Sequence, residues 1–199
     1  MNRRLFLSAV AGAALSVSTL VSGVAHAVTT DQATSLVRGV ADQVITLIKA
    51  PGTPASKAPQ LRAIMDRNVA MRDVAGFVLG RYARQTSPDQ RDRYVEAYKD
   101  YVARTYAARF SEYGGQTIDV TGAQDYGSKG VYVSSTTTYN GQVVNIGWQV
   151  REDRNGQPQI NDIVVDGLSM IESQRSDFAR LIQQQGGDID AFIQRLQTL

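Results

Sequence analysis

The sequence predicts an α+β protein in which an antiparallel sheet of about four strands is covered on one face by helices. Two observations predict this fold class. Apolar residues recur at helical spacing before residue 114 and again after residue 168, whereas apolar and polar residues alternate with a period of two between these regions. This order of helical, strand and helical patterns is typical of an α+β domain.

Four helices are predicted before the sheet. Thr29 with Gln32, and Ser87 with Gln90, have the spacing of capping boxes, so each pair marks a helix start. Pro88 follows Ser87 directly, at the first helical position that proline favours. The predicted helical ranges are 30–50, 61–69, 71–84 and 87–113.

The predicted strands cover residues 117–124, 129–139, 142–152 and 158–166. Asn140-Gly141 is the strongest turn signal, because this dipeptide favours a two-residue hairpin. In the third strand Val144, Ile146, Trp148 and Val150 share one face, which predicts one apolar and one largely polar side of the sheet. Two helices are expected after the sheet, the first capped by Ser169 with Glu172 and the second running from about Asp188 to Leu196.

The N-terminus has the features of an export signal. Arg3 and Arg4 precede an apolar stretch that reaches about Val24, and Ala25-His26-Ala27 places small residues around a cleavage position. We expect residues 1–27 to be removed, so that a single domain of residues 28–199 functions outside the cytoplasm. The paired arginines fit either the Sec or the twin-arginine route.

Composition restricts the chemistry that is available after export. The chain has no cysteine, and its one histidine lies in the predicted signal at His26. We therefore expect no disulfides, no Cys/His zinc site and no nucleophile activated by imidazole. Without Arg3 and Arg4, 19 basic side chains remain against 19 acidic ones, and this balance does not indicate a nucleic-acid partner.

Two features could carry a function. Asp162 and Asp166 flank an apolar strand segment and could serve as a general base with a tyrosine, although Asp166 before Gly167 is more typical of a strand-to-helix turn. The long predicted helix carries a broad face of tyrosines that includes Tyr94, Tyr98 and Tyr101. This face suits an ordinary core or the lining of an apolar cavity, and periodicity does not distinguish them.

The chain from residue 28 onward resembles the MlaC family of periplasmic phospholipid carriers, also called toluene-tolerance auxiliary proteins. The resemblance is carried by Val78-Leu79-Gly80-Arg81-Tyr82, by Ser87-Pro88-Asp89-Gln90-Arg91, and by the run from Ile163 to Ile171 with Arg175 and Phe178 after it. Ala83 departs from the large aromatic residue expected at that position, and we expect this departure to alter the size or depth of a cavity.

The resemblance implies a curved sheet and helices that enclose an apolar cavity for lipid acyl chains, with no catalytic group, metal or cofactor. It also implies partners, namely an inner-membrane ABC transporter complex and an outer-membrane lipoprotein complex. The apolar faces described above then become candidate lipid-binding surfaces. The residues expected to line the cavity are Val74, Phe77, Val78, Tyr98, Tyr101, Val102, Val133, Ile146, Trp148, Val165, Leu168 and Ile171.

Two other function classes stay open at the level of sequence. One is a small-ligand isomerase that uses Asp162 or Asp166 with a tyrosine. The other is a periplasmic interaction module that holds no lipid. Lipid that copurifies with the protein would favour the carrier over both alternatives.

Overall fold

The structure is a computed structural model and describes residues 28–199. The predicted export signal at residues 1–27 lies outside the described residues. The α-helices are α1 (Thr30–Lys49), α2 (Pro54–Asn68), α3 (Met71–Leu79), α4 (Pro88–Ala108), α5 (Met170–Gln184) and α6 (Ile189–Thr198). The strands are β1 (Asp119–Asp125), β2 (Val131–Tyr139), β3 (Gln142–Glu152), β4 (Pro158–Val165) and β5 (Leu168–Ser169). Short 3-10 helices are η1 (Gly80–Arg84), η2 (Arg109–Glu112) and η3 (Gly127–Lys129).

Side-chain capping sets the starts of α1 and α4, as predicted. The Thr29 hydroxyl accepts a hydrogen bond from the Gln32 amide at 3.2 Å, and the Gln32 side chain accepts one from the Thr29 amide at 3.0 Å. Ser87 and Gln90 make the same reciprocal pair at the start of α4. At α5 the Ser169 hydroxyl accepts from the Glu172 amide, but no return bond from Glu172 is present, so only half of the predicted capping box forms.

The second helix begins earlier than predicted. Thr53 caps α2 and Pro54 occupies its first position, seven residues before the expected start at Leu61. Sequence periodicity missed these turns because the segment has few large apolar residues and contains Pro59. Lys57 donates from Nζ to the carbonyl of Ile48 at 2.7 Å, which ties the start of α2 to the end of α1.

The sheet is an antiparallel meander in the order β1-β2-β3-β4-β5. Asn140 and Gly141 both have positive φ, of 50° and 76°, and form the predicted hairpin turn between β2 and β3. The expectation of about four strands missed β5, whose two residues are too few to show alternation. Asp166 and Gly167 therefore join β4 to β5 in a hairpin turn with positive φ, and do not lead directly into a helix as predicted.

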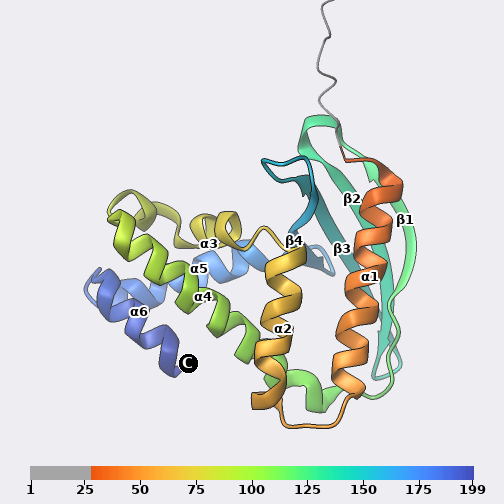
Figure 1. Ribbon diagram of the computed structural model, residues 1–199, viewed down its shortest axis with the longest axis horizontal. Helices are drawn as coiled ribbons and strands as arrows, with labels where there is room; N and C mark the ends of the chain where they lie inside the picture. The colour runs from red at the N-terminus through yellow and green to blue at the C-terminus, as the bar shows by residue number, and fades with distance from the viewer. Residues whose placement is uncertain (1–27) are drawn as a thin grey trace, which may run out of the picture.

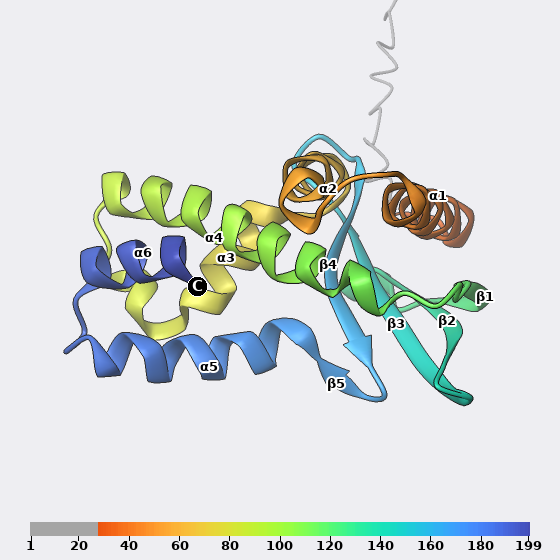
Figure 2. The same cartoon turned by 90° about the horizontal axis from the view of Figure 1, so that it is seen from below.

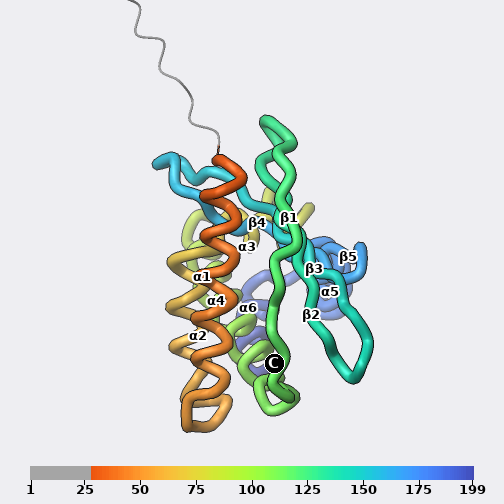
Figure 3. The backbone as a smooth tube through the Cα atoms, turned by 90° about the vertical axis from the view of Figure 1, so that its right-hand side faces the viewer, coloured from red at the N-terminus to blue at the C-terminus, as the bar shows by residue number. Residues whose placement is uncertain are grey.

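The core consists of two apolar clusters. The α1–α2 pair covers the inner face of the sheet, and Figures 1 and 3 show both helices on the same side of β1–β4. Residues of α3, α4, α5 and α6 form the second cluster around Phe178 and Phe192, to one side of the sheet. Figure 2 shows α4 running from this helical group to a position beside α2 and the sheet, so it contributes to both parts. In the part of the chain described, no helix combines the length and apolarity needed to cross a membrane.

Candidate functional site

A cavity of about 360 Å³ lies where the two apolar clusters meet. Its wall is built by α1, α2, α3 and α4, by η2, by the start of α5, and by β3 and β4. The side chains that line it are mainly aliphatic and aromatic. They are Val40, Ala41, Val44, Leu61, Ile64, Met65, Val69, Met71, Val74, Tyr98, Val102, Tyr106, Arg109, Phe110, Ile118, Trp148, Ile160, Asn161, Asp162, Ile163, Met170, Ile171 and Gln174.

A β-bulge shapes the part of the wall that β4 contributes. Val150 of β3 pairs with Ile160 and Gln149 pairs with Asp162, which leaves Asn161 without a partner residue in β3. The extra residue bends the strand, and four successive residues from Ile160 to Ile163 consequently line the cavity. The buried Oδ1 atom of Asn161 has no hydrogen-bond partner in the described residues.

Polar groups gather where α4, α5 and β4 approach one another. The Tyr98 hydroxyl donates to the Gln174 side chain at 2.5 Å. Burial raises the pKa of Tyr98 far above its usual range, so this phenol stays protonated. Asp162 accepts hydrogen bonds from the Ser169 hydroxyl at 2.6 Å and from the Ile171 amide at 3.3 Å, which fixes the carboxylate at the start of α5.

A second cavity of about 470 Å³ adjoins the first, and Val44 and Ile118 belong to the walls of both. It lies between the C-terminal half of α1 and the ends of the central strands. Tyr113 lines it, and the buried hydroxyl of this residue has no hydrogen-bond partner in residues 28–199. The other lining residues are Ile45, Ile48, Gln116, Thr137, Tyr139, Val144, Ile146, Val165 and Asp166.

Seven of the predicted cavity residues lie in these walls. The first cavity includes Val74, Tyr98, Val102, Trp148 and Ile171. The second includes Ile146 and Val165. These side chains come from α3, α4, α5, β3 and β4, so the fold brings residues nearly 100 positions apart to one site. Their contact with a ligand stays a prediction.

The other five predicted residues lie away from both walls. Val78 is buried in the helical cluster, and Tyr101 packs there with its ring centroid 5.6 Å from that of Phe178. Val133 is fully buried between the sheet and its covering helices. Phe77 is 38% exposed beneath the Arg175 guanidinium, and Leu168 is 66% exposed in the β4–β5 hairpin. Each of these residues has the expected apolar spacing. The side chain, however, packs against other side chains in the core or is exposed to solvent.

The first two helices contribute to the first cavity, which was not predicted from the sequence. Val40 and Val44 of α1 and Leu61, Ile64 and Met65 of α2 line the first cavity. Their amphipathic spacing was visible, but it indicates only that one face is buried. Whether that face meets a filled core or a cavity depends on how the helices pack.

The short motifs behind the family resemblance have structural roles. Gly80 ends α3 with a φ of 59°, and a Cβ there would lie 3.0 Å from Nε of Arg175. The arginine can therefore cross close to the backbone and reach the Phe77 ring, with its guanidinium carbon 4.8 Å from the ring centroid. Ala83 packs against the helical cluster and lines neither cavity, so an effect of this position on cavity size stays a prediction.

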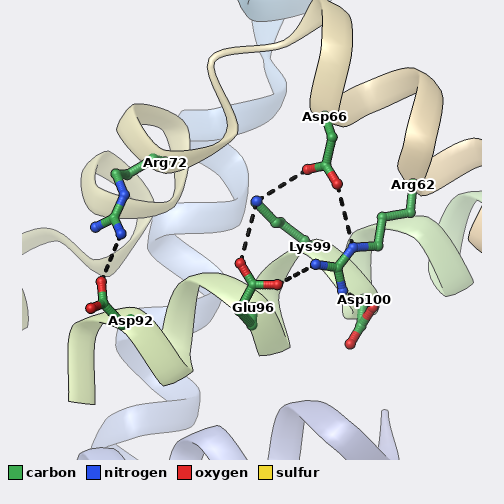
Figure 4. Close-up of polar contacts among 7 residues, drawn as sticks. All are labelled: Arg62, Asp66, Arg72, Asp92, Glu96, Lys99 and Asp100. Carbon is green, nitrogen blue, oxygen red and sulfur yellow. Dashed lines mark hydrogen bonds and ion pairs between the residues drawn. The ribbon is translucent and has the colours of Figure 1, made fainter. Parts of the chain in front are cut away.

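An ion-pair network joins α2 to α4 on the outside of the cavity wall. The Arg62 guanidinium contacts Glu96, Asp100 and, at 3.6 Å, Asp66 (Figure 4). Lys99 joins the same network through Asp66 at 3.1 Å and Glu96 at 3.4 Å. Within residues 28–199, no group of three or more His, Cys, Asp and Glu side chains could hold a metal ion.

The fold and the site define a class of α+β proteins in which helices and a meander sheet surround an apolar cavity. The model of the MlaC protein family matches residues 38–198, and the chain belongs to that family.

Named relatives agree with this assignment. The toluene tolerance protein ttg2D of Pseudomonas putida is 28% identical over 114 residues, or 57% of this chain, and the match spans only about half of that protein, 53%. The intermembrane phospholipid transport system binding protein MlaC of Haemophilus influenzae is 23% identical over 172 residues, covering 81% of this chain and 79% of that protein. A solved phospholipid-binding protein from Ralstonia solanacearum, in complex with a phospholipid, has the same fold with a TM-score of 0.68 at 23% identity, covering 84% of this chain and 96% of that one.

Proposed function

We propose that this protein is a periplasmic carrier that holds the acyl chains of a phospholipid in the apolar cavity and moves the lipid between the two membranes. One observation carries the proposal, namely a cavity of about 360 Å³ whose wall is mainly aliphatic and aromatic. Apolar cavities do not stabilise water, because water needs several polar partners. An apolar ligand is the occupant that such a wall favours.

The physical need for a carrier follows from the cost of exposing lipid tails. A diacyl lipid has roughly 30 methylenes, and at about 0.8 kcal/mol each their exposure to water would cost on the order of 24 kcal/mol. A protein that covers both tails removes most of this barrier. The second cavity shares Val44 and Ile118 with the first, and it provides adjoining space for the remainder of the chains.

Family membership supports the rest of the proposal. The relatives named above are called toluene tolerance and phospholipid transport proteins, and the solved relative contains a phospholipid. By analogy, an inner-membrane ABC transporter complex and an outer-membrane lipoprotein complex exchange lipid with this chain. Removal of residues 1–27 as an export signal, which would leave one lipid-binding domain over residues 28–199, belongs to the same proposal.

A carrier needs no catalytic group, and the acidic residues considered for an isomerase have structural partners. Asp162 accepts from Ser169 and from the Ile171 amide. Asp166, in the β4–β5 turn, accepts from the backbone amide of Asn145 in β3 at 2.9 Å. Both contacts use these carboxylates to hold backbone in place, so the geometry favours a carrier over an enzyme.

Native mass spectrometry of the exported protein, followed by extraction and identification of the lipid, tests the proposal. We expect one mass that corresponds to protein plus phospholipid. A protein that carries no lipid, and takes none from vesicles, would favour an interaction module.

A cavity-blocking variant tests the location of the lipid. We expect Val44→Trp to abolish or strongly reduce lipid uptake, because Val44 is half-buried and its side chain borders both cavities. Val143→Trp is the matched control, since Val143 is 66% exposed near the β2–β3 turn. Circular dichroism should show that both variants are folded, and equal lipid content in the two would contradict the assigned cavity.

A further inference from the structure

Arg109 is the only basic residue in the wall of the first cavity as residues 28–199 define it. It opens η2, directly after the last residue of α4, and its side chain is exposed. Other wall residues, such as Trp148 and Leu61, are buried. Arg109 therefore lies at the rim of the cavity, where an occupant would meet solvent.

The Arg109 guanidinium has no ion-pair or hydrogen-bond partner in the described residues, unlike the arginines of the preceding helix α4. Arg91 and Arg104 each donate to a backbone carbonyl, at 2.9 Å and 2.6 Å. Arg93 pairs with carboxylates of α4 and α6. Within residues 28–199, no ion pair or side-chain hydrogen bond involves Arg109, which leaves its five donors available.

Tyr106 lies beside Arg109 on the same helical face, three residues earlier, and also lines the cavity. Its side chain is 39% exposed, which places it at the same rim. Burial raises the pKa of the Tyr106 hydroxyl, and the nearby Arg109 charge opposes this only in part, so the hydroxyl stays protonated at neutral pH. The two residues together offer a cation and a neutral hydrogen-bond donor.

The acidic side chain in this wall makes no ion pair with Arg109. Asp162 is the only carboxylate among the described residues that line the first cavity, and it accepts from Ser169 and from the Ile171 amide. The rim therefore has an uncompensated guanidinium next to an apolar interior. An amphiphile with long apolar chains and an anionic group at their junction matches this arrangement.

We propose that Arg109, together with the Tyr106 hydroxyl, binds the phosphate group of the phospholipid whose acyl chains occupy the first cavity. The planar fork of a guanidinium matches two phosphate oxygens, and such charge-assisted bonds are stronger than neutral ones. This inference rests on the proposed carrier function and adds a group that recognises the cargo. It predicts that the protein distinguishes a phospholipid from a diacylglycerol with the same tails.

The test measures binding of two ligands to the delipidated protein in the same detergent micelles: phosphatidylethanolamine and the diacylglycerol of identical chains. Phosphatidylethanolamine is zwitterionic, so a loss of its binding reports a local contact and not the overall charge of the protein. We expect Arg109→Ala to weaken phosphatidylethanolamine binding about tenfold and to leave diacylglycerol binding unchanged. Arg109→Lys keeps the charge but loses the planar fork. Its affinity for phosphatidylethanolamine should lie between that of wild type and that of Arg109→Ala.

Arg154→Ala is the matched control, because it removes an equal charge from an exposed site in the β3–β4 turn, away from the cavity. Thermal unfolding checks that each variant is folded. Unchanged phosphatidylethanolamine binding in Arg109→Ala, or an equal loss for both ligands, would overturn the phosphate assignment. Wild-type protein that binds neither ligand would instead overturn the carrier function itself.

A second experiment distinguishes binding of a lipid headgroup from binding of a free anion. Inorganic phosphate at millimolar concentration should not displace phosphatidylethanolamine from wild-type protein, because the acyl chains supply most of the affinity. Displacement by inorganic phosphate would show an ion site that is independent of the lipid, and would overturn the inference.

Discussion

On the inner face of the sheet, the Trp148 indole nitrogen donates to the Ser135 hydroxyl at 2.8 Å, and that hydroxyl donates to the Ile146 carbonyl at 3.1 Å. Ser135 is one of the few buried polar residues of the described chain. It satisfies an indole N–H beside the first cavity, where the indole ring forms part of the wall. A polar residue on the apolar face of the sheet thus orients a large cavity-lining side chain.

Replacing this serine should destabilise the protein. We expect Ser135→Ala to lower the free energy of unfolding by about 1–3 kcal/mol, because the buried indole N–H would lose its acceptor. Ser134→Ala is the matched control, since Ser134 is only half-buried and its hydroxyl makes no hydrogen bond within residues 28–199. Urea denaturation of both variants checks this. Equal denaturation midpoints for Ser135→Ala and Ser134→Ala would show that the hydrogen bond from Trp148 to Ser135 does not stabilise the protein.

Among the elements, α2 and α4 pack side by side and both contribute to the cavity wall, and the Arg62 network joins them (Figure 4). Partial burial lowers the pKa of Arg62, but hydrogen bonds to Asp100 and Glu96 outweigh it and raise the net value. The hydrogen bond from Arg62 holds the pKa of Glu96 below its usual value, and Lys99 acts in the same direction. Both shifts favour the charged forms of Arg62 and Glu96 at neutral pH.

The network should make the α2–α4 contact sensitive to acid. A carboxyl group whose pKa is lower in the folded state stabilises the protein above its unfolded pKa, and this contribution is lost as the pH falls through the folded value. Because Glu96 is largely exposed, we expect Glu96→Gln to cost no more than about 1 kcal/mol at pH 7. The difference from wild type should shrink below about pH 4.5, near the ordinary carboxyl pKa.

Chemical denaturation at pH 7 and at pH 3 measures this difference. Glu152→Gln is the control, because Glu152 is exposed and has no ion pair in the described part of the chain. A Glu96→Gln effect that is the same at both pH values would argue against the ion pairs as its source.

At the scale of the whole molecule, the first cavity lies where the helical cluster meets the sheet and its covering helices, and the second adjoins it between α1 and the sheet. Side chains around an empty cavity lack packing partners on one side, so the free protein loses dispersion contacts there. A ligand that binds only the folded state stabilises it in proportion to the logarithm of its concentration over its dissociation constant. Stability of the molecule should therefore depend on its cargo.

We expect delipidation to lower the melting temperature by several degrees. Lipid at about 100 times its dissociation constant contributes about 2.7 kcal/mol, and each kcal/mol shifts the melting temperature of a domain of this size by about 2–4 °C. Differential scanning calorimetry before and after delipidation, and again after reloading from vesicles, checks this. Identical melting temperatures in the three samples would mean that lipid does not fill the folded interior.

Local signals predicted the elements of this fold well. Thr29 and Ser87 start helices as expected, and Asn140-Gly141 turns the central hairpin, because each signal acts over three or four residues. The α2 start and the strand β5 were missed where the local pattern is weak or too short. The family was also recognisable from short motifs. The motif around Gly80 packs helices together, whereas the run from Ile163 to Ile171 contributes several residues to the cavity walls.

The candidate site was predicted only in part. Val102 and Trp148 line the cavity as expected, whereas Val78 and Val133, which have the same apolar spacing, are buried in filled core. Periodicity identifies the face of a helix or strand that avoids water. It carries no information on what stands opposite that face.

The sequence by itself determined the order of helices and strands, the polarity of the sheet faces and the absence of cysteine, because these depend on composition and on neighbours along the chain. Only the tertiary structure decided which apolar faces leave a cavity between them, and that Arg109 lies at its rim. A cavity is the space that remains after distant elements pack. Its shape depends on contacts among α1, α2, α4, β3 and β4, which no local pattern encodes.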